Sequence, residues 1–496
     1  MVEKKERGTF NSRRMFIFAM MGSVIGLGNI WRFPSVLYGN GGASFLVAYL
    51  LILFILGISH LFLEYGVGFN FKSSVAGVFS KINKKYEILG WFLPFNIFLV
   101  LTYYVVIVAW GLIYFVLSFA HSWGTDPNSY FNALVLQTST PTLSGFLTIS
   151  IPVIVALLLI WVFIWLCSGS SVEKGIGKVC SILMPLMFVL MIIVIIFAFT
   201  LPGASLGVAN LFTPDWGMLL NPALWLIVLA QIAFSMGLGD STAITFTSYI
   251  DKESKLMDNA IIVTLINFVF GLMASLGVFA ILGFMSTTQG LPFSQVVTEG
   301  TGLVFVAFPT IFNVMGVLSY IIAPLFFLCF LFAGFTSAVA LFEPMASSIG
   351  EKFALSRRKA AGIMVIIGCL ISLFFATGSG AYMLNVADSF LNEITLSLVI
   401  LSEAIIFAWI IGADKLSEFL NKHSKFQVGK KWMFIVKYII PVVIIFLWIN
   451  GVYNLVLTNT PIDWIIEVFF IILLIAVPAI LTKLPGKSKE FYESNS

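Results

Sequence analysis

The chain has 496 residues, of which 60% are hydrophobic and only 10% are charged, and its mean hydropathy is +1.04. Soluble domains carry about 25% charged residues, so this composition excludes an ordinary soluble protein and indicates an integral membrane protein. The net charge is only +4, and no Arg-rich patch favours nucleic acid as a partner.

A membrane-spanning helix requires about 20 mainly apolar residues. Twelve stretches meet this requirement, and we expect an all-α membrane protein with twelve transmembrane helices. In chain order they cover residues 13–38, 42–69, 89–120, 151–168, 179–200, 220–250, 256–285, 315–349, 360–377, 381–411, 433–456 and 462–482. The linkers 121–150 and 286–314 are long enough to hold short helices of their own.

The positions of the basic residues predict the orientation. If the N-terminal segment 1–12 lies inside the cell, all 27 Lys and Arg residues except Arg32 fall in or beside cytoplasmic segments, including the tail 483–496. Short cytoplasmic loops carry an excess of Lys and Arg. We therefore expect a multi-pass protein of the cell (inner) membrane with both termini in the cytoplasm and with lipid as its surroundings.

Two glycine clusters, at 22–28 and 235–241, lie near the middle of the first and sixth predicted spans. Five spans separate the starts of the two units, so the two copies would have opposite orientation. This pattern predicts an inverted repeat of residues 13–200 and 220–411, followed by two peripheral helices in 433–482. Close helix packing on small residues is the alternative explanation of either cluster alone.

Glycine clusters also predict a binding site. Each glycine destabilises a helix by roughly 1 kcal/mol relative to Ala, and an unwound segment in lipid needs other partners for its backbone. Free N–H groups at the start of one half-helix suit a carboxylate, and free carbonyls at the end of the other suit a cation. A zwitterionic amino acid with sodium ions satisfies both ends.

The run 26–34, GLGNIWRFP, resembles the first-helix signature of the neurotransmitter:sodium symporter family. Tyr103 and Tyr104 and the runs 231–235, 332–337 and 412–415 follow in family order, so the resemblance covers about residues 7–480. Well-known members that it resembles are the bacterial leucine transporter and similar prokaryotic amino-acid symporters. The resemblance implies a sodium-coupled symporter of a small amino acid that works by alternating access, not an enzyme, and it leaves a homodimer open.

The resemblance also implies the site residues. One sodium site would use Val24, Asn29, Ser235 and Asn267, and a second would use Gly22, Ile25, Ala333, Thr336 and Ser337. The substrate would contact Val24, Leu27, Gly28, Val100, Tyr104, Phe234, Ser235, Gly237, Asp240, Ala338 and Leu341. The outer gate would consist of Arg32, Asp388 and Phe234, and the inner gate of Arg7, Ser248, Tyr249 and Glu351, with Phe10 where the family usually has Trp.

Departures from the family pattern leave several questions open. The chloride position corresponds to Tyr49, Gln231, Ser235, Asn267 and Gly271. Chloride-independent relatives usually have a carboxylate at the last of these and chloride-dependent ones a serine, so chloride dependence stays undecided. The monoamine branch has an aspartate where this chain has Gly26, which favours a substrate that brings its own carboxylate.

Asp240 stands where the family usually has an apolar residue. It would recognise a polar or cationic substrate side chain, supply an extra ion or proton site, or turn toward water or a neighbouring donor. Glu64 and Glu403, also within spans, are expected to brace helices.

The alternatives to sodium symport are a proton-coupled or sodium-independent transporter of the same fold, a passive channel and a membrane enzyme. His60, His121 and His423 lie in different segments without metal-ligand spacing, which disfavours the enzyme.

Overall fold

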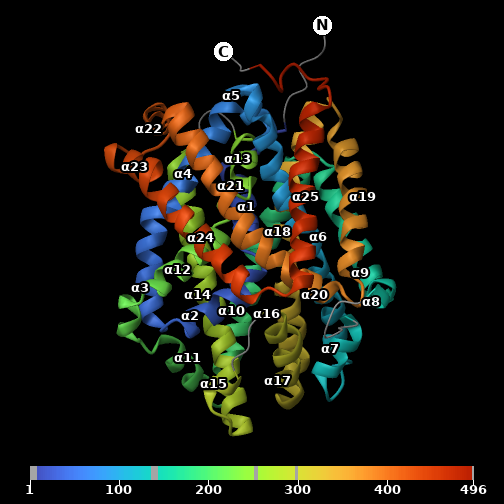
Figure 1. The fold of residues 1–496 in the computed structure, drawn as a ribbon. Coiled ribbons are helices and arrows are strands. Elements are labelled where there is room, and N and C mark those ends of the chain that lie inside the picture. The colour runs from blue at the N-terminus through green and yellow to red at the C-terminus, as the bar shows by residue number, and fades with distance from the viewer. Residues whose placement is uncertain (1–7, 136–142, 251–254, 297–299, 494–496) are drawn as a thin grey trace.

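The computed structural model of the protein describes residues 8–135, 143–250, 255–296 and 300–493. Within these ranges the elements are all helical, apart from an isolated bridge between Ile149 and Thr377. Helices satisfy their backbone groups internally, which is what a chain inside lipid requires. Figure 1 shows long helices running roughly along one direction, with short helices at both ends of the bundle.

The first five spans agree with the predicted positions to within several residues, and two of them contain π-helical turns. They are α1 (Arg13–Val24) with α2 (Leu27–Gly39), α3 (Ala43–Ile52) with η1 (Leu53–Gly57) and α4 (Ile58–Phe71), α6 (Glu87–Ser118), α9 (Ile151–Ser168), and η3 (Glu173–Gly177) with α10 (Lys178–Phe199).

The remaining spans follow the same pattern. They are α12 (Pro222–Ser235) with α13 (Thr242–Thr247), α14 (Leu256–Gln289), α18 (Ser319–Lys352), α19 (Arg357–Phe375), α20 (Gly380–Ser389) with η7 (Phe390–Thr395), α21 (Leu396–Glu403) and η8 (Ala404–Gly412), α23 (Lys430–Phe434) with η9 (Ile435–Ile439) and α24 (Ile440–Thr458), and α25 (Pro461–Lys483).

Short helices occupy the connections, including the linkers 121–150 and 286–314 where they are predicted and several others where they are not. They are α5 (Val75–Ile82), η2 (Lys84–Tyr86), α7 (Pro127–Val135), α8 (Leu143–Leu147), α11 (Ala204–Phe212), η4 (Trp216–Leu220), α15 (Phe293–Val296), α16 (Gly300–Gly302), η5 (Leu303–Ala307), α17 (Phe308–Val314), η6 (Gly316–Leu318) and α22 (Ala413–Lys422).

The number of spans fits the twelve predicted. In the part of the chain that the structure describes, ten helical stretches are long and apolar enough to cross a membrane, and the bent pair α1–α2 makes an eleventh. The shorter apolar helix α12, continued by α13, is the interrupted sixth span. The limits of the two repeat units stay a prediction.

The tenth span differs from its predicted end at residue 411. The chain stays helical to Lys422, but Gly412 has φ of 103° and ψ of 117°, which turns the chain between η8 and α22. Glycine tolerates this backbone conformation. Because α22 carries four charged side chains, it lies beyond the apolar stretch although it follows without a linker.

Burial separates central from peripheral helices. In the most apolar window of each span, 83% of the residues are buried for α6 and 78% for α18, against 22% for α24 and 28% for α25. The last two spans are therefore peripheral, as the sequence predicts. Both labelled chain ends lie at the same end of the bundle in Figure 1, beside α5, while α7, α15 and α17 lie at the opposite end. Which end faces the cytoplasm stays a prediction.

Candidate ion and substrate site at two helix breaks

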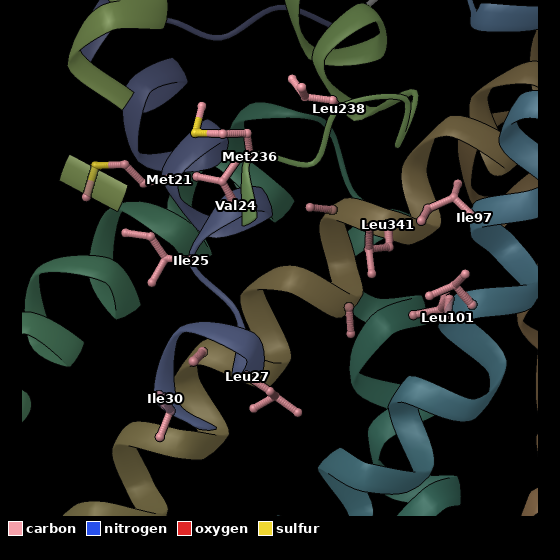
Figure 2. Packing of buried hydrophobic residues seen from close by; sticks show 14 of the residues in the cluster. Met21, Val24, Ile25, Leu27, Ile30, Ile97, Leu101, Met236, Leu238 and Leu341 are labelled. Atoms are coloured by element: carbon pink, nitrogen blue, oxygen red, sulfur yellow. The ribbon is translucent and has the colours of Figure 1, made fainter. Parts of the chain in front are cut away.

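The first span is interrupted between α1 and α2, which are bent by 56° relative to one another. Ile25 and Gly26 connect them in an extended conformation. Figure 2 shows the chain leaving its helical path between Val24 and Leu27, with Leu341 of α18 and Leu101 of α6 in the surrounding apolar packing. The interruption frees carbonyls at the end of α1 and N–H groups at the start of α2.

The sixth span is interrupted between Ser235 and Thr242. Gly237, Gly239 and Ser241 all have positive φ, at 60°, 76° and 61°. Glycine adopts this conformation at little cost, which explains two of the three positions, while serine pays a small steric penalty there. The glycine-rich sequence therefore forms a turn instead of a continuous helix.

Polar side chains join the two breaks at the first predicted sodium site. The Asn29 Nδ2 donates to Asn267 Oδ1 at 2.9 Å, and the Asn267 Nδ2 donates to Ser235 Oγ at 2.9 Å and to the Ser235 carbonyl at 3.1 Å. All three side chains are buried, and Val24 lies buried at the end of α1. The four residues predicted for this site thus come from α1, α2, α12 and α14, and three of them are in direct contact.

The second predicted sodium site lies between α1 and α18. The Ser337 hydroxyl donates to the carbonyls of Gly22 at 3.0 Å and Ile25 at 3.3 Å. The Thr336 hydroxyl donates to the Ala333 carbonyl at 3.2 Å. A Cβ added at Gly22 would lie 3.1 Å from the Thr336 Cβ, so the two helices approach closely. All five predicted residues therefore meet in one place, and their oxygen atoms are the ligands that a hard cation prefers.

The predicted substrate region lies beside these ion positions. The Leu27 N–H points to the Tyr104 hydroxyl at 3.5 Å. Val100, Ala338 and Leu341 are buried apolar residues on α6 and α18. A Cβ added at Gly237 would lie 2.8 Å from Asp240 Oδ2.

The Asp240 carboxylate is therefore folded over the turn at Gly237. It is half-buried and has no hydrogen-bond or ion-pair partner among the residues that the structure describes.

A layered contact closes the site on the α2 side. A Cβ added at Gly28 would lie 2.4 Å from the Phe234 ring, so only glycine allows this ring to lie against α2. The Arg32 guanidinium lies 4.6 Å from the centroid of the same ring, a cation–π contact. Phe234 is thus placed between Gly28 and Arg32, at the position predicted for a lid.

The predicted partner of Arg32 is bonded elsewhere. Asp388 Oδ1 accepts from the Tyr103 hydroxyl and from Asn392 Nδ2, both at 2.8 Å. Over the described ranges no ion pair within 4.0 Å joins Arg32 to Asp388. The resemblance did not include Asn392, which lies one helical turn after Asp388 and could be found by that spacing.

The opposite end of the site is closed by packing. Phe10 is buried, its ring lies edge-on to Phe16, Phe246 and Tyr249, and its N–H donates to the Tyr249 carbonyl at 3.0 Å. The predicted gate residue Arg7 lies outside the described residues. Ser248 donates to the Thr245 carbonyl of its own helix at 2.6 Å.

The other two predicted inner-gate residues belong to separate groups. The Glu351 carboxylate accepts from the Ser73 hydroxyl and the Ser74 N–H, both at 2.6 Å. The Tyr249 hydroxyl donates to Glu343 Oε1 at 2.7 Å. Arg357 also donates to both carboxylate oxygens of Glu343, at 2.6 and 2.7 Å. Sequence reasoning missed Glu343, although an acidic residue within an apolar span is a signal of its own.

At the predicted chloride position, two buried side-chain donors have no acceptor in hydrogen-bond geometry among the residues that the structure describes. These are the Tyr49 hydroxyl, which lies close to the Ser235 side chain, and the Gln231 amide, one helical turn before Ser235. A Cβ added at Gly271 would lie 3.2 Å from the Phe33 ring, and Phe33 also packs against Tyr49. The glycine therefore makes room for the ring and contributes no carboxylate to this region.

Comparisons with known proteins agree with this architecture. The family model of the sodium:neurotransmitter symporter family matches residues 7–137 and 124–482. An uncharacterized sodium-dependent transporter of Methanocaldococcus jannaschii is 37% identical over 441 residues, which cover 88% of this chain and 89% of that protein. The bovine sodium- and chloride-dependent creatine transporter 1 is 30% identical over 82% of this chain and 71% of its own length.

A solved structure is also similar. The crystal structure of MhsT in complex with L-phenylalanine has a TM-score of 0.76 and 29% sequence identity, and the match covers 90% of this chain and 100% of that one. Fold, helix breaks and family model thus lead to the same conclusion. The chain belongs to the sodium:neurotransmitter symporter family and is a sodium-coupled membrane transporter, not an enzyme.

Proposed function

We propose that this protein carries a small amino acid across the membrane together with sodium. The observation that carries the proposal is the surroundings of Gly26. A Cβ there would lie 2.9 Å from Ser337 Oγ and 3.3 Å from the Tyr104 hydroxyl, so the glycine lets these two hydroxyls approach the break and brings no acidic side chain to it. A substrate that supplies its own carboxylate suits the N–H groups that begin α2 and the Tyr104 hydroxyl.

The ammonium group of such a substrate would face the carbonyls that end α1 and α12. Phe234 would cover it, and Val100, Ala338 and Leu341 would line its side chain. The bound L-phenylalanine in the MhsT structure supports an amino acid as the ligand of this fold. The most direct test is a thermal-shift screen of the purified protein against amino acids, in sodium chloride and in potassium chloride. The proposal is refuted if no amino acid raises the unfolding midpoint in sodium.

The second sodium site is proposed to lie at Gly22, Ile25, Ala333, Thr336 and Ser337, and Thr336→Ala with Ser337→Ala tests it. A ligand at 100 times its dissociation constant stabilises the folded state by about 2.7 kcal/mol, so sodium should raise the unfolding midpoint above its value in potassium. We expect the double variant to lose part of this difference, because two hydroxyl ligands are removed.

Ser347→Ala with Ser348→Ala is the matched control on the same helix, since these hydroxyls donate to the Pro344 carbonyl away from the breaks. An equal sodium effect in the two double variants would contradict the site.

Asp240 is proposed to select the substrate side chain. Its carboxylate is half-buried and has no protein partner over the described ranges, so it is available to a donor or a cation on the substrate. Removing one partner of a charged hydrogen bond costs about 1.5–3 kcal/mol, or roughly a 10- to 100-fold loss of affinity. We expect Asp240→Asn to weaken binding of basic or polar amino acids by this factor and to spare apolar ones.

Competition between amino acids in sodium-dependent uptake measures this selectivity. Asp126→Asn, in an exposed loop where hydrogen bonds from Ser129 lower the pKa of the carboxyl, is the control for loss of one negative charge. An unchanged order of preference in Asp240→Asn would assign Asp240 to water or to a neighbouring group.

Chloride is proposed to bind between Tyr49 and Gln231, because a buried donor without an acceptor costs about 1–3 kcal/mol and an anion would satisfy both. Equal uptake in sodium chloride and sodium gluconate would exclude this role.

A further inference from the structure

Three ionisable side chains from distant parts of the chain meet inside the bundle. His60 and Glu64 lie one turn apart on α4, and Glu403 ends α21. The His60 Nε2 lies 3.0 Å from Glu403 Oε2 and 3.7 Å from Glu64 Oε1, and all three side chains are at most 1% exposed. From the sequence, Glu64 and Glu403 are expected to brace helices and His60 has no role, because the contact between His60 and Glu403 spans 343 residues.

No strong cation neutralises this cluster in the part of the chain that the structure describes. Lys72, at the end of α4, donates to the Ile250 carbonyl, and Lys437 of η9 lies 3.5 Å from Asp414. The other ionisable groups nearby are Tyr65 on α4 and Asp240 in the turn after α12, which interact electrostatically with Glu64, and Asp240 also interacts with Glu403. The side chains that α24 presents beside His60 are apolar.

Charge alone therefore requires bound protons. An isolated ionised carboxylate in a low-dielectric interior is so costly that the group takes up a proton instead. The single imidazole can offset only one of the two carboxylates, and Asp240 adds a further negative charge. Over the described ranges, His60 Nδ1, Glu64 Oε2 and Glu403 Oε1 are buried without a donor or acceptor from another residue type, and the carboxyl groups of Glu64 and Glu403 interact with one another. A cavity of about 30 Å³ borders His60, which is room for about one water molecule.

The cluster is bonded directly to the interrupted sixth span. The Gly239 N–H donates to Glu64 Oε1 at 2.8 Å. A Cβ added at Gly239 would lie 2.9 Å from Ile400, on the same helix as Glu403. The turn that follows Ser235 is thus held between α4 and α21. A hydrogen bond donated to a carboxylate stabilises its charged form, so a turn that moves away leaves Glu64 better suited to hold a proton.

We propose that His60, Glu64 and Glu403 form a proton-binding site that releases a proton when sodium binding brings the Gly239 turn against Glu64. The proton passes to the aqueous medium and is taken up again when sodium leaves and the turn withdraws. Sodium and protons therefore exchange in opposite directions at sites that share one turn. The inference rests on sodium coupling and not on the identity of the transported molecule.

The test uses the full-length purified protein in a weakly buffered solution with a pH-sensitive dye and no amino acid. We expect sodium chloride to release protons and potassium chloride at equal concentration to release none. Glu403→Gln and His60→Leu should lose this release, while the sodium-dependent rise in the unfolding midpoint persists. His423→Leu is the matched control, because that ring packs against Phe69 and Phe419 outside the cluster.

A measurement on the unmodified protein covers the case in which the variants do not fold. The infrared difference spectrum between the sodium and potassium forms should contain the C=O stretching band of a protonated carboxyl group, shifted in heavy water. Neither proton release nor such a band in the unmodified protein would overturn the proposal. Equal proton release from all variants would also overturn it. So would zinc that is retained by the unmodified protein and lost from His60→Leu, since the same side chains would then form a metal site. A failed amino-acid screen would leave these results unaffected.

Discussion

At the scale of single residues, Glu343 is firmly held near the end of the bundle that bears the termini. Arg357 donates to both of its carboxylate oxygens and the Tyr249 hydroxyl adds a third hydrogen bond. Bidentate contacts between Arg and a carboxylate are among the strongest polar interactions in proteins. Because the Tyr249 carbonyl also accepts a hydrogen bond from the Phe10 N–H, this network connects α18 to the segment before α1.

Glu343→Gln should therefore lower the unfolding midpoint clearly. Breaking a buried ion pair costs about 3–5 kcal/mol, and we expect the lower part of this range because Arg357 remains 26% exposed. Glu418→Gln removes a partner of an exposed pair with Lys422 at 2.7 Å and should leave the midpoint unchanged. Equal thermal midpoints for both variants in detergent would show that the Glu343 network does not hold this end closed.

At the scale of elements, the segment after α25 joins three spans. The Lys487 N–H donates to the Lys352 carbonyl at 2.8 Å. The Lys352 ammonium in turn donates to Glu87 of α6 at 2.5 Å and to the Leu481 carbonyl of α25 at 2.6 Å. Phe491 is fully buried and stacks on Trp91 with 6.2 Å between ring centroids. The segment is thus part of the packed structure.

Phe491→Ala should destabilise the protein. Truncating a buried Phe to Ala costs about 3–5 kcal/mol, and we expect somewhat less because a terminal segment can readjust. Phe446→Ala, at a position on α24 that is 63% exposed, is the control for loss of a ring from the outer surface. Thermal unfolding of the two variants decides the point, and a midpoint in Phe491→Ala that equals the control would mean that the segment packs without contributing stability.

At the scale of the whole molecule, the placement of basic residues predicts that the end bearing both termini lies in the cytoplasm. The structure offers exposed positions to test this, Lys489 in the segment after α25 and Asp126 directly before α7. Figure 1 shows α7 at the end of the bundle opposite to the chain ends. A membrane-impermeant maleimide added to intact cells should label Asp126→Cys and leave Lys489→Cys unlabelled, in a Cys369→Ser background because that thiol is only half-buried. The reverse labelling pattern would invert the topology.

Much of this architecture could be predicted from the sequence because its signals are local. Apolar length located the spans, and the clusters around Gly26 and Gly239 located the breaks. The resemblance to known symporters selected the residues that line them.

Contacts that depend on three-dimensional packing could not be read in the same way. The pairing of His60 with Glu403, the placement of Phe234 against Gly28 and the binding of Asp388 by Tyr103 each join separate spans. Apolar helices that present many similar faces give no sequence pattern that fixes which faces meet.

The interactions that hold the two ends of the transport path closed differ greatly in strength. Around Phe234 the described residues supply the Arg32 guanidinium over the ring, a cation–π contact worth about 0.5–2 kcal/mol, and a longer-range attraction between Arg32 and Glu393, whereas the Glu343 carboxylate accepts three hydrogen bonds. Thermal motion will therefore open the α2 side far more often than the end that the Glu343 network closes. Without ligands, the molecule should consequently rest in a conformation that is open at the α2 side. The rate of each cycle should then depend on how fast substrate and sodium bind there, and not on reopening of the opposite end.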